Sequence, residues 1–543
     1  MFTNVVVSEI NQIPCLLIAL LSPIFAALAI SIYTLTGRRL SRNVCGIIST
    51  GSLIISTAFI VIVAVKLLRT GRPVLETYPF TIIDVTGVFG LYADGISLIM
   101  GILITFLSAA ATLYSVSYMA TLEFFLNRET ESYQIFSRFA RSFQIGLEHP
   151  EYVPERKPHV VPAVEFFFVN LLLFAACMLG MVISTNLVFF VIFYEFVAIP
   201  TFLIVYVWGS GPCRLIGIKY FMYMGTSGVL VLIGIAAIWA VTGSLSLFDV
   251  PTLVQKAGIE TAILIAAILF VGFGIKAAIW PFHSWLPDTH AQSPAQIASL
   301  LSGAYTKCGI YGIIRFVFPC LAVIGSSAIT IILAIGLITM YWGAITSMIQ
   351  RDVKRLLAFS TMNQLGYIIF GFGSGTFIGI LGALFHIVAH GVSKAMLMLL
   401  AGSLIHATHN RDLNKYSGLA PTMPVTATCT IIGALSIAGV PPLAGFISEW
   451  MIFTGVTQAG YLTIAVLGFL STVLTMGYYL WVIRRAFFHS IPDMLKNVRE
   501  SPLPIIIPIA IECFFVILIG IYPQLVIQFL APIATSLHDM LQV

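Results

Sequence analysis

Charged residues are scarce in this chain of 543 residues. Asp, Glu, Lys and Arg together make up only 9% of it, whereas a soluble globular domain carries about a quarter. A soluble protein of this length would need those charges on its surface, so we expect most of the surface to face lipid. The formal net charge of +5 is small, and the Lys and Arg residues are spread over short connections. This pattern excludes a soluble nucleic-acid-binding protein.

Motifs for metals, cofactors and covalent catalysis are also lacking. The eight cysteines are scattered singly, without a CxxC or a Cys/His pair at ligand spacing, which argues against a zinc, haem or iron–sulfur site. We interpret them as small buried apolar residues. The sequence contains no nucleophile elbow and no phosphate-binding loop. We therefore expect no cofactor and no metal on this chain, and no conventional membrane enzyme.

Long apolar runs are what the chain has instead, because 59% of its residues are apolar. A membrane span needs about 20 of them, and we count 14 such runs, all expected to be helices because open sheet edges do not survive in hydrocarbon. The predicted fold is thus an all-α integral membrane protein. The runs lie near residues 12–36, 44–68, 88–119, 164–184, 186–208, 215–242, 260–286, 293–320, 325–348, 356–372, 375–405, 426–455, 460–483 and 503–535.

Basic residues indicate the orientation of these spans. With 14 spans, 19 of the 27 Lys and Arg residues fall on one side of the membrane and four on the other. Basic residues favour the cytoplasmic side, so both termini are predicted to lie outside. The remaining four basic residues lie within the spans. They are Lys276, Lys307, Arg315 and Lys394, and the acidic residues within spans that we match to them are Asp94, Glu195 and Glu449.

A charge near the centre of a membrane helix costs about 2.5–3.5 kcal/mol. For Arg315, snorkelling from a helix end is as good an explanation as function. Snorkelling fits Glu195, Lys276, Lys307 and Glu449 poorly, because each has several apolar residues on both sides. We therefore predict that these four residues act on ions or protons.

Prolines lie close to two of the predicted functional residues. Lys276 precedes Pro281 by five residues, and Glu449 follows the pair Pro441–Pro442 by seven. A proline interrupts a helix, and broken helices form the polar sites of many transporters. We predict broken helices 7 and 12 within two inverted five-helix repeats. The predicted regions are 1–119 (helices 1–3), 120–163 (loop), 164–320 (first repeat), 325–483 (second repeat) and 484–543 (loop and helix 14).

Three further titratable residues share one helical face. His386, His390 and Lys394 are spaced four apart, so they line up along a helix. His titrates closest to neutral pH, which favours a proton relay over the transport of a large solute. A structural role for the histidines and a metal site are the alternatives, although further metal ligands are lacking.

Four motifs carry a family resemblance over about residues 90–485. The stretches GIKAAIWPFHSWLPDTHAQSP, GAYTKCGIYG, HIVAHGVSKAM and GVPPLAGFISEW resemble the antiporter-like subunits of complex I and its relatives. These relatives are deazaflavin- and ferredoxin-linked dehydrogenases, membrane-bound hydrogenases and multisubunit sodium/proton antiporters. The family's fold has fourteen helices with inverted repeats.

The resemblance implies roles for individual residues. Glu195 is similar to the family's fifth-helix glutamate and Lys276 to the seventh-helix lysine that pairs with it. Lys307 resembles the central lysine of the eighth helix, and His390 the relay histidine of the eleventh. Glu449 stands where most paralogues have lysine and M-type subunits have glutamate. The chain also ends soon after its last span, without the long lateral helix of L-type subunits. Both features favour the M type, whereas Lys394 departs from many M-type chains.

The resemblance implies a proton-translocating subunit of a redox-driven complex, and we expect the chain to be a multi-pass protein of the cell membrane. Implied partners are L-, N- and K-type membrane subunits and a hydrophilic arm with flavin or deazaflavin and iron–sulfur clusters. A cation/proton antiporter or hydrogenase subunit is the main alternative, and a structural scaffold is disfavoured by the buried charges. The predicted loop 120–163 is longer than the family's. Its Ile135, Phe136, Phe139 and Phe143 share a helical face, typical of an interfacial helix or a contact with a neighbouring subunit.

Overall fold

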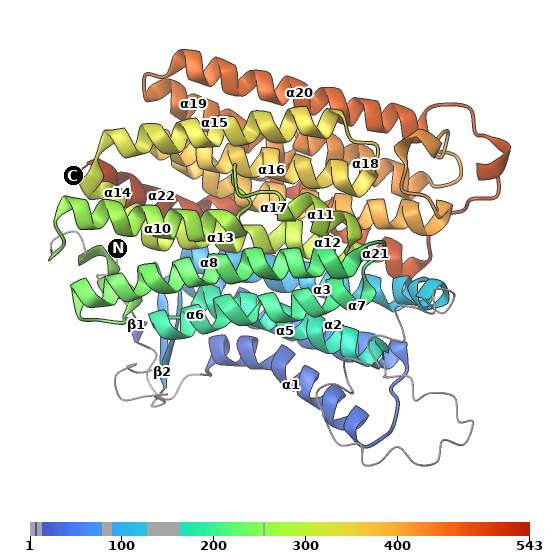
Figure 1. Cartoon of the computed structure of the whole chain (residues 1–543), viewed down its shortest axis with the longest axis horizontal. Coiled ribbons are helices and arrows are strands. Elements are labelled where there is room, and N and C mark those ends of the chain that lie inside the picture. The colour runs from blue at the N-terminus through green and yellow to red at the C-terminus, as the bar shows by residue number, and fades with distance from the viewer. Residues whose placement is uncertain (1–5, 8–12, 79–88, 127–162, 253–255, 543) are drawn as a thin grey trace.

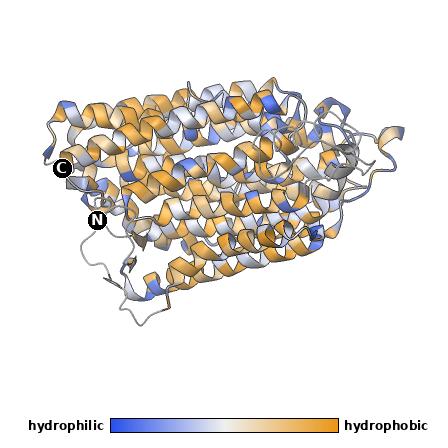
Figure 2. Ribbon diagram, turned by 60° about the horizontal axis from the view of Figure 1, so that its bottom comes forward, coloured by the Kyte–Doolittle hydropathy of each residue, from blue (hydrophilic) through white to orange (hydrophobic). Residues whose placement is uncertain are grey.

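The structure, a computed structural model, describes residues 6–7, 13–78, 89–126, 163–252 and 256–542, most of them in long helices that run side by side (Figure 1). Hydrophilic residues gather towards the two ends of these helices, and hydrophobic residues cover their length (Figure 2). This distribution is that of a bundle with lipid around its middle and water at both ends.

The N-terminal part contains α1 (Cys15–Leu35), α2 (Arg42–Thr70), α3 (Gly95–Leu126), α5 (Ala163–Ile183), α6 (Leu187–Phe196), α7 (Ala198–Trp208) and α8 (Cys213–Thr242). The middle contains the 3₁₀ helix η2 (Leu247–Thr252), α10 (Ile259–Lys276), α11 (Trp285–Gln292), α12 (Ala295–Leu300), α13 (Thr306–Gly312) and α14 (Phe318–Ile324). The π-helical segments η3 (Leu301–Tyr305) and η4 (Ile313–Val317) join α12, α13 and α14 into one continuous run.

The C-terminal part contains α15 (Ser326–Met348), α16 (Val353–Phe372), α17 (Phe377–Thr408), α18 (Pro424–Ile437), α19 (Ala444–Gln458), α20 (Leu462–Phe487), α21 (Leu503–Ile521) and α22 (Gln524–Gln542). Short 3₁₀ turns lie at η5 (Leu413–Lys415) and η6 (Asp493–Leu495). The helices α1, α2, α5, α6 and α7 lie in the lower part of Figure 1, and α15, α16, α18, α19 and α20 lie in the upper part.

Twelve helices among the described residues are long and apolar enough to cross a membrane. This confirms the predicted class, a helical membrane protein with many spans, whereas the number fourteen stays a prediction. The helix α16 falls outside the twelve although it has 20 residues, because polar side chains along its buried length lower its hydropathy. The predicted span at 426–455 is also absent from the twelve. It consists of two shorter helices, α18 and α19, which residues 438–443 separate.

The structure differs from the sequence expectation at two places. Residues 503–535 form two helices rather than one span, because α21 ends at Ile521 and α22 begins at Gln524. Between them lies Pro523, and a proline disfavours helical backbone at the residue before it. The described residues also include a three-stranded sheet, which we did not expect. In it β1 (Val6–Val7) pairs in parallel with β2 (Val74–Tyr78), and β2 pairs antiparallel with β3 (Phe89–Ala93).

The long connection predicted at 120–163 begins later than expected, because α3 continues to Leu126. Its predicted amphipathic segment, with Ile135, Phe136, Phe139 and Phe143, lies outside the described residues. The boundaries of the predicted repeats remain predictions.

Two helical runs form the centre of the bundle. The apolar windows of Ala295–Ala322 and of Phe377–Thr408 are fully buried, unlike those of the other spans. The second run, α17, contacts α3, α12, α16, α18, α19, α21 and α22. Lys307 lies on the first run, and His386, His390 and Lys394 lie on the second, so these four residues are in the interior.

Candidate functional site: a buried row of titratable side chains

Lys276 is the last residue of α10, and it is only 1% exposed. Its ammonium nitrogen donates a hydrogen bond of 2.9 Å to the carbonyl oxygen of Tyr194 and lies 3.4 Å from the centre of the Tyr194 ring. A cation is favoured both by an aromatic face and by the C-terminal end of a helix. After Lys276 the chain leaves the helix, and α11 begins only at Trp285.

Glu195 lies near the end of α6, one residue beyond the carbonyl group that Lys276 contacts. Its side chain is half-buried and lies against Gly228 of α8, where an added Cβ atom would come within 1.3 Å of the carboxylate. No ion pair joins Glu195 to Lys276 in the described part of the chain. Lys276 is therefore held by the backbone next to Glu195, not by its carboxylate.

Lys307 is fully buried on α13. The π-helical segments η3 and η4 lie directly before and after α13, and such bulges inside helices are frequent at functional sites. The Lys307 ammonium group donates to the carbonyl oxygen of Ser302, which η3 presents. The Ser302 hydroxyl lies 2.7 Å from that of Thr361 on α16.

His386, His390 and Lys394 lie on one face of α17, each at most 1% exposed. The two imidazole rings are stacked, with centroids 5.8 Å apart and planes 5° from parallel. The Nδ1 atom of His386 lies 2.8 Å from the Ser448 hydroxyl. Neither ring nitrogen of His390 has a hydrogen-bond partner among the described residues.

Lys394 is held by hydroxyl groups alone. Its ammonium nitrogen donates hydrogen bonds of 2.7 Å to Ser360 Oγ and 2.7 Å to the Tyr479 hydroxyl. No ion pair between Lys394 and a carboxylate occurs in the described ranges. A buried cation without a counter-charge is costly, which is the property expected of a group that binds and releases a proton.

Glu449 lies in the second turn of α19 and is 4% exposed. Its Oε2 atom accepts a hydrogen bond of 3.1 Å from the Thr472 hydroxyl, and its Oε1 atom has no partner within the described chain. Gly439 lies beside the carboxylate with φ of +68°, and a Cβ atom there would be 2.5 Å from Oε2. Only glycine combines this backbone conformation with room for the carboxylate.

Arg315 is not a snorkelling residue, which corrects one of its two sequence interpretations. It is 4% exposed and forms two hydrogen bonds, of 2.7 and 2.6 Å, with the carboxylate of Asp94. A third hydrogen bond of 3.0 Å reaches Ser97 Oγ. The pair joins η4 to the start of α3, and bidentate geometry of this kind makes a strong ion pair.

The sequence analysis did not identify Glu512 and His290 as candidate functional residues, although both are buried and titratable. Glu512 of α21 is fully buried, and neither of its carboxylate oxygens has a hydrogen-bond partner among the residues described. A Glu inside an apolar run was the signal that could have revealed it. His290 of α11 is also fully buried; its Nδ1 atom lies 2.9 Å from the Leu286 carbonyl oxygen, and its Nε2 atom has no partner in that same part of the chain.

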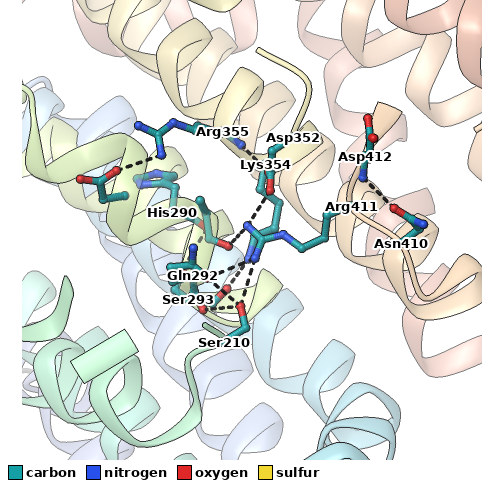
Figure 3. Close-up of polar contacts among 12 residues, drawn as sticks. Ser210, His290, Gln292, Ser293, Asp352, Lys354, Arg355, Asn410, Arg411 and Asp412 are labelled. Atoms are coloured by element: carbon teal, nitrogen blue, oxygen red, sulfur yellow. Dashed lines mark hydrogen bonds and ion pairs between the residues drawn. The ribbon is translucent and has the colours of Figure 1, made fainter. Parts of the chain in front are cut away.

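His290 lies beside a polar cluster at one end of the bundle (Figure 3). Lys354 of α16 is 4% exposed and donates to the Ser293 carbonyl oxygen. Arg411 forms an ion pair of 2.8 Å with Asp352 and hydrogen bonds of 3.1 Å with Ser210 and Gln292. This cluster joins residues at the end of α11 and the start of α16 to the segments that follow α7 and α17.

Comparisons with known proteins identify the family of the chain. Residues 184–475 match the family described as "NADH:quinone oxidoreductase/Mrp antiporter, TM", and residues 80–127 match "NADH-Ubiquinone oxidoreductase (complex I), chain 5 N-terminus". NADH-quinone oxidoreductase subunit M of Rickettsia prowazekii is 27% identical over 79% of this chain and 91% of its own. F(420)H(2) dehydrogenase subunit M of Methanosarcina mazei is 30% identical over 67% of this chain and 74% of its own.

Solved structures share the fold. A chain of the archaeal membrane-bound sulfane sulfur reductase has a TM-score of 0.78 at 25% identity, covering 95% of this chain and 77% of that one. A chain of respiratory complex I from Thermus thermophilus has a TM-score of 0.79 at 21% identity, covering 97% of this chain and 99% of that one. With more than half of its length matched, and with M subunits among its relatives, the chain belongs to the antiporter-like membrane subunits of the NADH:quinone oxidoreductase/Mrp antiporter family.

Proposed function

We propose that this chain is a proton-translocating membrane subunit of a redox-driven dehydrogenase of the complex I type, linked to NADH, deazaflavin or ferredoxin. The observation that carries the proposal is the row of fully buried lysines, Lys276, Lys307 and Lys394, which contact backbone carbonyls and hydroxyls instead of carboxylates in the described chain. A membrane scaffold would have no use for such costly groups.

The proposed route begins at Glu195 and Lys276. Redox chemistry elsewhere in the complex rearranges these two residues, which changes the proton affinity of Lys276. A proton then passes through Lys307 and the region of His390 to Glu449 and leaves the membrane. The carbonyl contact at Tyr194 supports the first step, because it holds Lys276 close to Glu195 without locking it in an ion pair.

The energies involved are compatible with this scheme. Moving one charge against 100 mV costs about 2.3 kcal/mol. Two unit charges about 4 Å apart interact by about 4 kcal/mol at the effective dielectric constant of a protein interior. Forming or breaking one contact between Glu195 and Lys276 therefore supplies energy of the required size.

The proposal includes partners that this chain alone does not contain. The membrane partners are L-, N- and K-type subunits, and the electrons pass through a hydrophilic arm with flavin or deazaflavin and iron–sulfur clusters. We place no cofactor on this chain and no nucleic acid among its partners. The complex lies in the cell membrane, and both termini of this chain face outwards.

Mass spectrometry of the proteins that co-purify from gently solubilised membranes tests the proposal. Hydrophilic flavin or deazaflavin and iron–sulfur subunits in the same complex would establish the redox-driven pump and name its electron donor. Small membrane partners alone would instead identify a cation/proton antiporter. The description of the matched family, which names both the NADH:quinone oxidoreductase and the Mrp antiporter, supports this second candidate. Hydrogenase subunits in the complex would identify the membrane-bound hydrogenase.

A further inference from the structure

Two facing rows of polar side chains connect the helices α16 and α20 inside the second half of the bundle. We call these rows the polar seam. Its members are Ser360, Asn363, Gln364 and Tyr367 of α16 and Ser471, Thr472, Thr475, Tyr478 and Tyr479 of α20. All are between 0 and 7% exposed. The spacing of three to four residues places each row on one face of its helix.

One end of the polar seam is Lys394. The Ser360 hydroxyl that accepts from Lys394 also accepts a hydrogen bond of 2.8 Å from the Tyr478 hydroxyl. The Tyr479 hydroxyl, the second partner of Lys394, lies 2.9 Å from Ser360 as well. The ammonium group is therefore continuous with a cluster of three hydroxyls.

The middle of the polar seam is organised by Asn363. Its amide nitrogen donates 3.0 Å to Ser471 Oγ, and its carbonyl oxygen accepts from Thr475 Oγ1 at 3.1 Å. Asn363 thereby lies between Ser360 and Tyr367 on α16 and bonds two hydroxyls of α20.

The other end of the polar seam is Glu449. The hydroxyls of Tyr367 and Thr472 are 2.8 Å apart, and Thr472 donates 3.1 Å to Glu449 Oε2. No hydrogen bond joins the histidine row to this carboxylate among the described residues: His386 Nδ1 lies 2.8 Å from Ser448, whose hydroxyl donates 2.8 Å to the Gly445 carbonyl oxygen. The His386 ring itself stacks on Tyr367 of the polar seam, with centroids 5.8 Å apart. The only hydrogen bond to the Glu449 carboxylate in the described chain thus comes from the polar seam.

We propose that the polar seam is the path by which a proton passes from Lys394 to Glu449. This inference rests on the proposed function and adds the residues of its last internal step. An N–H bond of Lys394 breaks, and the hydroxyl cluster of Ser360, Tyr478 and Tyr479 takes up this proton and gives one of its own. The Asn363 amide does not relay protons, and no direct hydrogen bond joins this cluster to Tyr367 among the described residues, so water molecules carry the proton past Asn363. Tyr367 and Thr472 then pass a proton on, and an O–H bond forms on Glu449. The hydroxyls then rotate back to their starting orientation.

Interhelical hydroxyl contacts also stabilise membrane proteins without any role in transport. The chain offers a matched control in Thr50 and Thr112, whose hydroxyls lie 3.0 Å apart between α2 and α3 and away from the titratable row. A mere packing role predicts that Thr472→Val and Thr112→Val act alike. A path predicts that only Thr472→Val slows proton transfer.

The test uses the assembled complex in inverted membrane vesicles, with NADH, reduced deazaflavin or reduced ferredoxin as donor. Initial proton uptake is measured with a pH-sensitive dye, and the amount of complex is measured by immunoblot. We expect Thr472→Val and Tyr367→Phe to slow proton uptake by roughly tenfold, the equivalent of about one hydrogen bond in the barrier. Thr472→Ser, which keeps the hydroxyl, restores it, and Thr112→Val leaves it at the wild-type rate.

Wild-type uptake by both Thr472→Val and Tyr367→Phe would overturn the inference, as would equal losses in Thr472→Val and Thr112→Val. The variants Glu195→Gln and Glu449→Gln are measured in parallel. If these two also translocate protons at the wild-type rate, the proposed function itself fails. If they lose translocation while the variants of the polar seam keep it, only the path is wrong.

Discussion

The ammonium nitrogen of Lys276 lies 2.9 Å from the carbonyl oxygen of Tyr194. Tyr194 immediately precedes Glu195, so the backbone carries the lysine to within reach of a carboxylate that it does not touch. The two side chains form no ion pair within the described chain. The proposed route requires a movement that makes and breaks their contact.

Replacing Glu195 by glutamine removes the charge and keeps the shape of the side chain. We expect donor-driven proton uptake in membrane vesicles to fall by more than tenfold, because the rearrangement of Lys276 loses its partner charge, while the chain still inserts. Glu260→Gln is the control, since Glu260 is exposed at the start of α10. Full pumping by the Glu195→Gln variant would contradict the proposed route.

The position of the Glu195 carboxylate can be changed without altering Glu195 itself. An added Cβ at Gly228 would lie 1.3 Å from Oε1, so Gly228→Ala must displace the carboxylate. We expect this variant to lose proton uptake about as severely as Glu195→Gln. Gly225→Ala on the same helix is a matched control, because nothing lies within 4 Å of its added Cβ. Equal activity of the two alanine variants would show that the carboxylate position does not matter.

The ion pair between Arg315 and Asp94 is predicted to be a structural necessity. Asp94→Asn leaves a buried guanidinium without its counter-charge and should destabilise the chain by about 3–5 kcal/mol. The double variant Asp94→Leu with Arg315→Met removes both charges and should cost much less. Thermal unfolding in detergent, followed by the loss of monodisperse protein, compares the two. The pair is not structural if Asp94→Asn unfolds at the wild-type temperature.

Removal of the Glu512 carboxylate is predicted to stabilise the chain, the opposite of the effect predicted for Asp94→Asn. Both of its carboxylate oxygens lack a partner within the described chain, and an unsatisfied buried polar group costs about 1–3 kcal/mol. Replacing it by leucine, which is apolar and of similar size, should therefore raise the unfolding temperature. The same unfolding assay measures this change, with Glu512→Gln as the polar isostere. A lower unfolding temperature for Glu512→Leu would mean that the carboxylate is bound by a group from another subunit or by solvent.

Much of this protein could be predicted from its sequence because lipid is a demanding solvent. Backbone groups in hydrocarbon must be satisfied within each helix, so length and hydropathy alone mark the spans, as for α5 and α8. The helical repeat likewise predicts that His386, His390 and Lys394 share one face of α17, because that relation is local. Pro523 also indicates a break in the helix. Because the apolar run continues across it, the sequence predicted one span over 503–535 instead of a helix that ends at Ile521.

Tertiary structure alone decided which groups meet, because those choices join residues far apart in the chain. Asp94 and Arg315 are 221 positions apart, and Lys394 and Tyr479 are 85 apart. Such pairs depend on how helices pack against one another, and neither hydropathy nor periodicity records that packing. The sequence by itself determined that the chain is a membrane bundle with charges in its core. Side-chain contacts between α16 and α20 and between α6 and α10 decided that those charges face hydroxyls and carbonyls, because such contacts form only once the helices are packed.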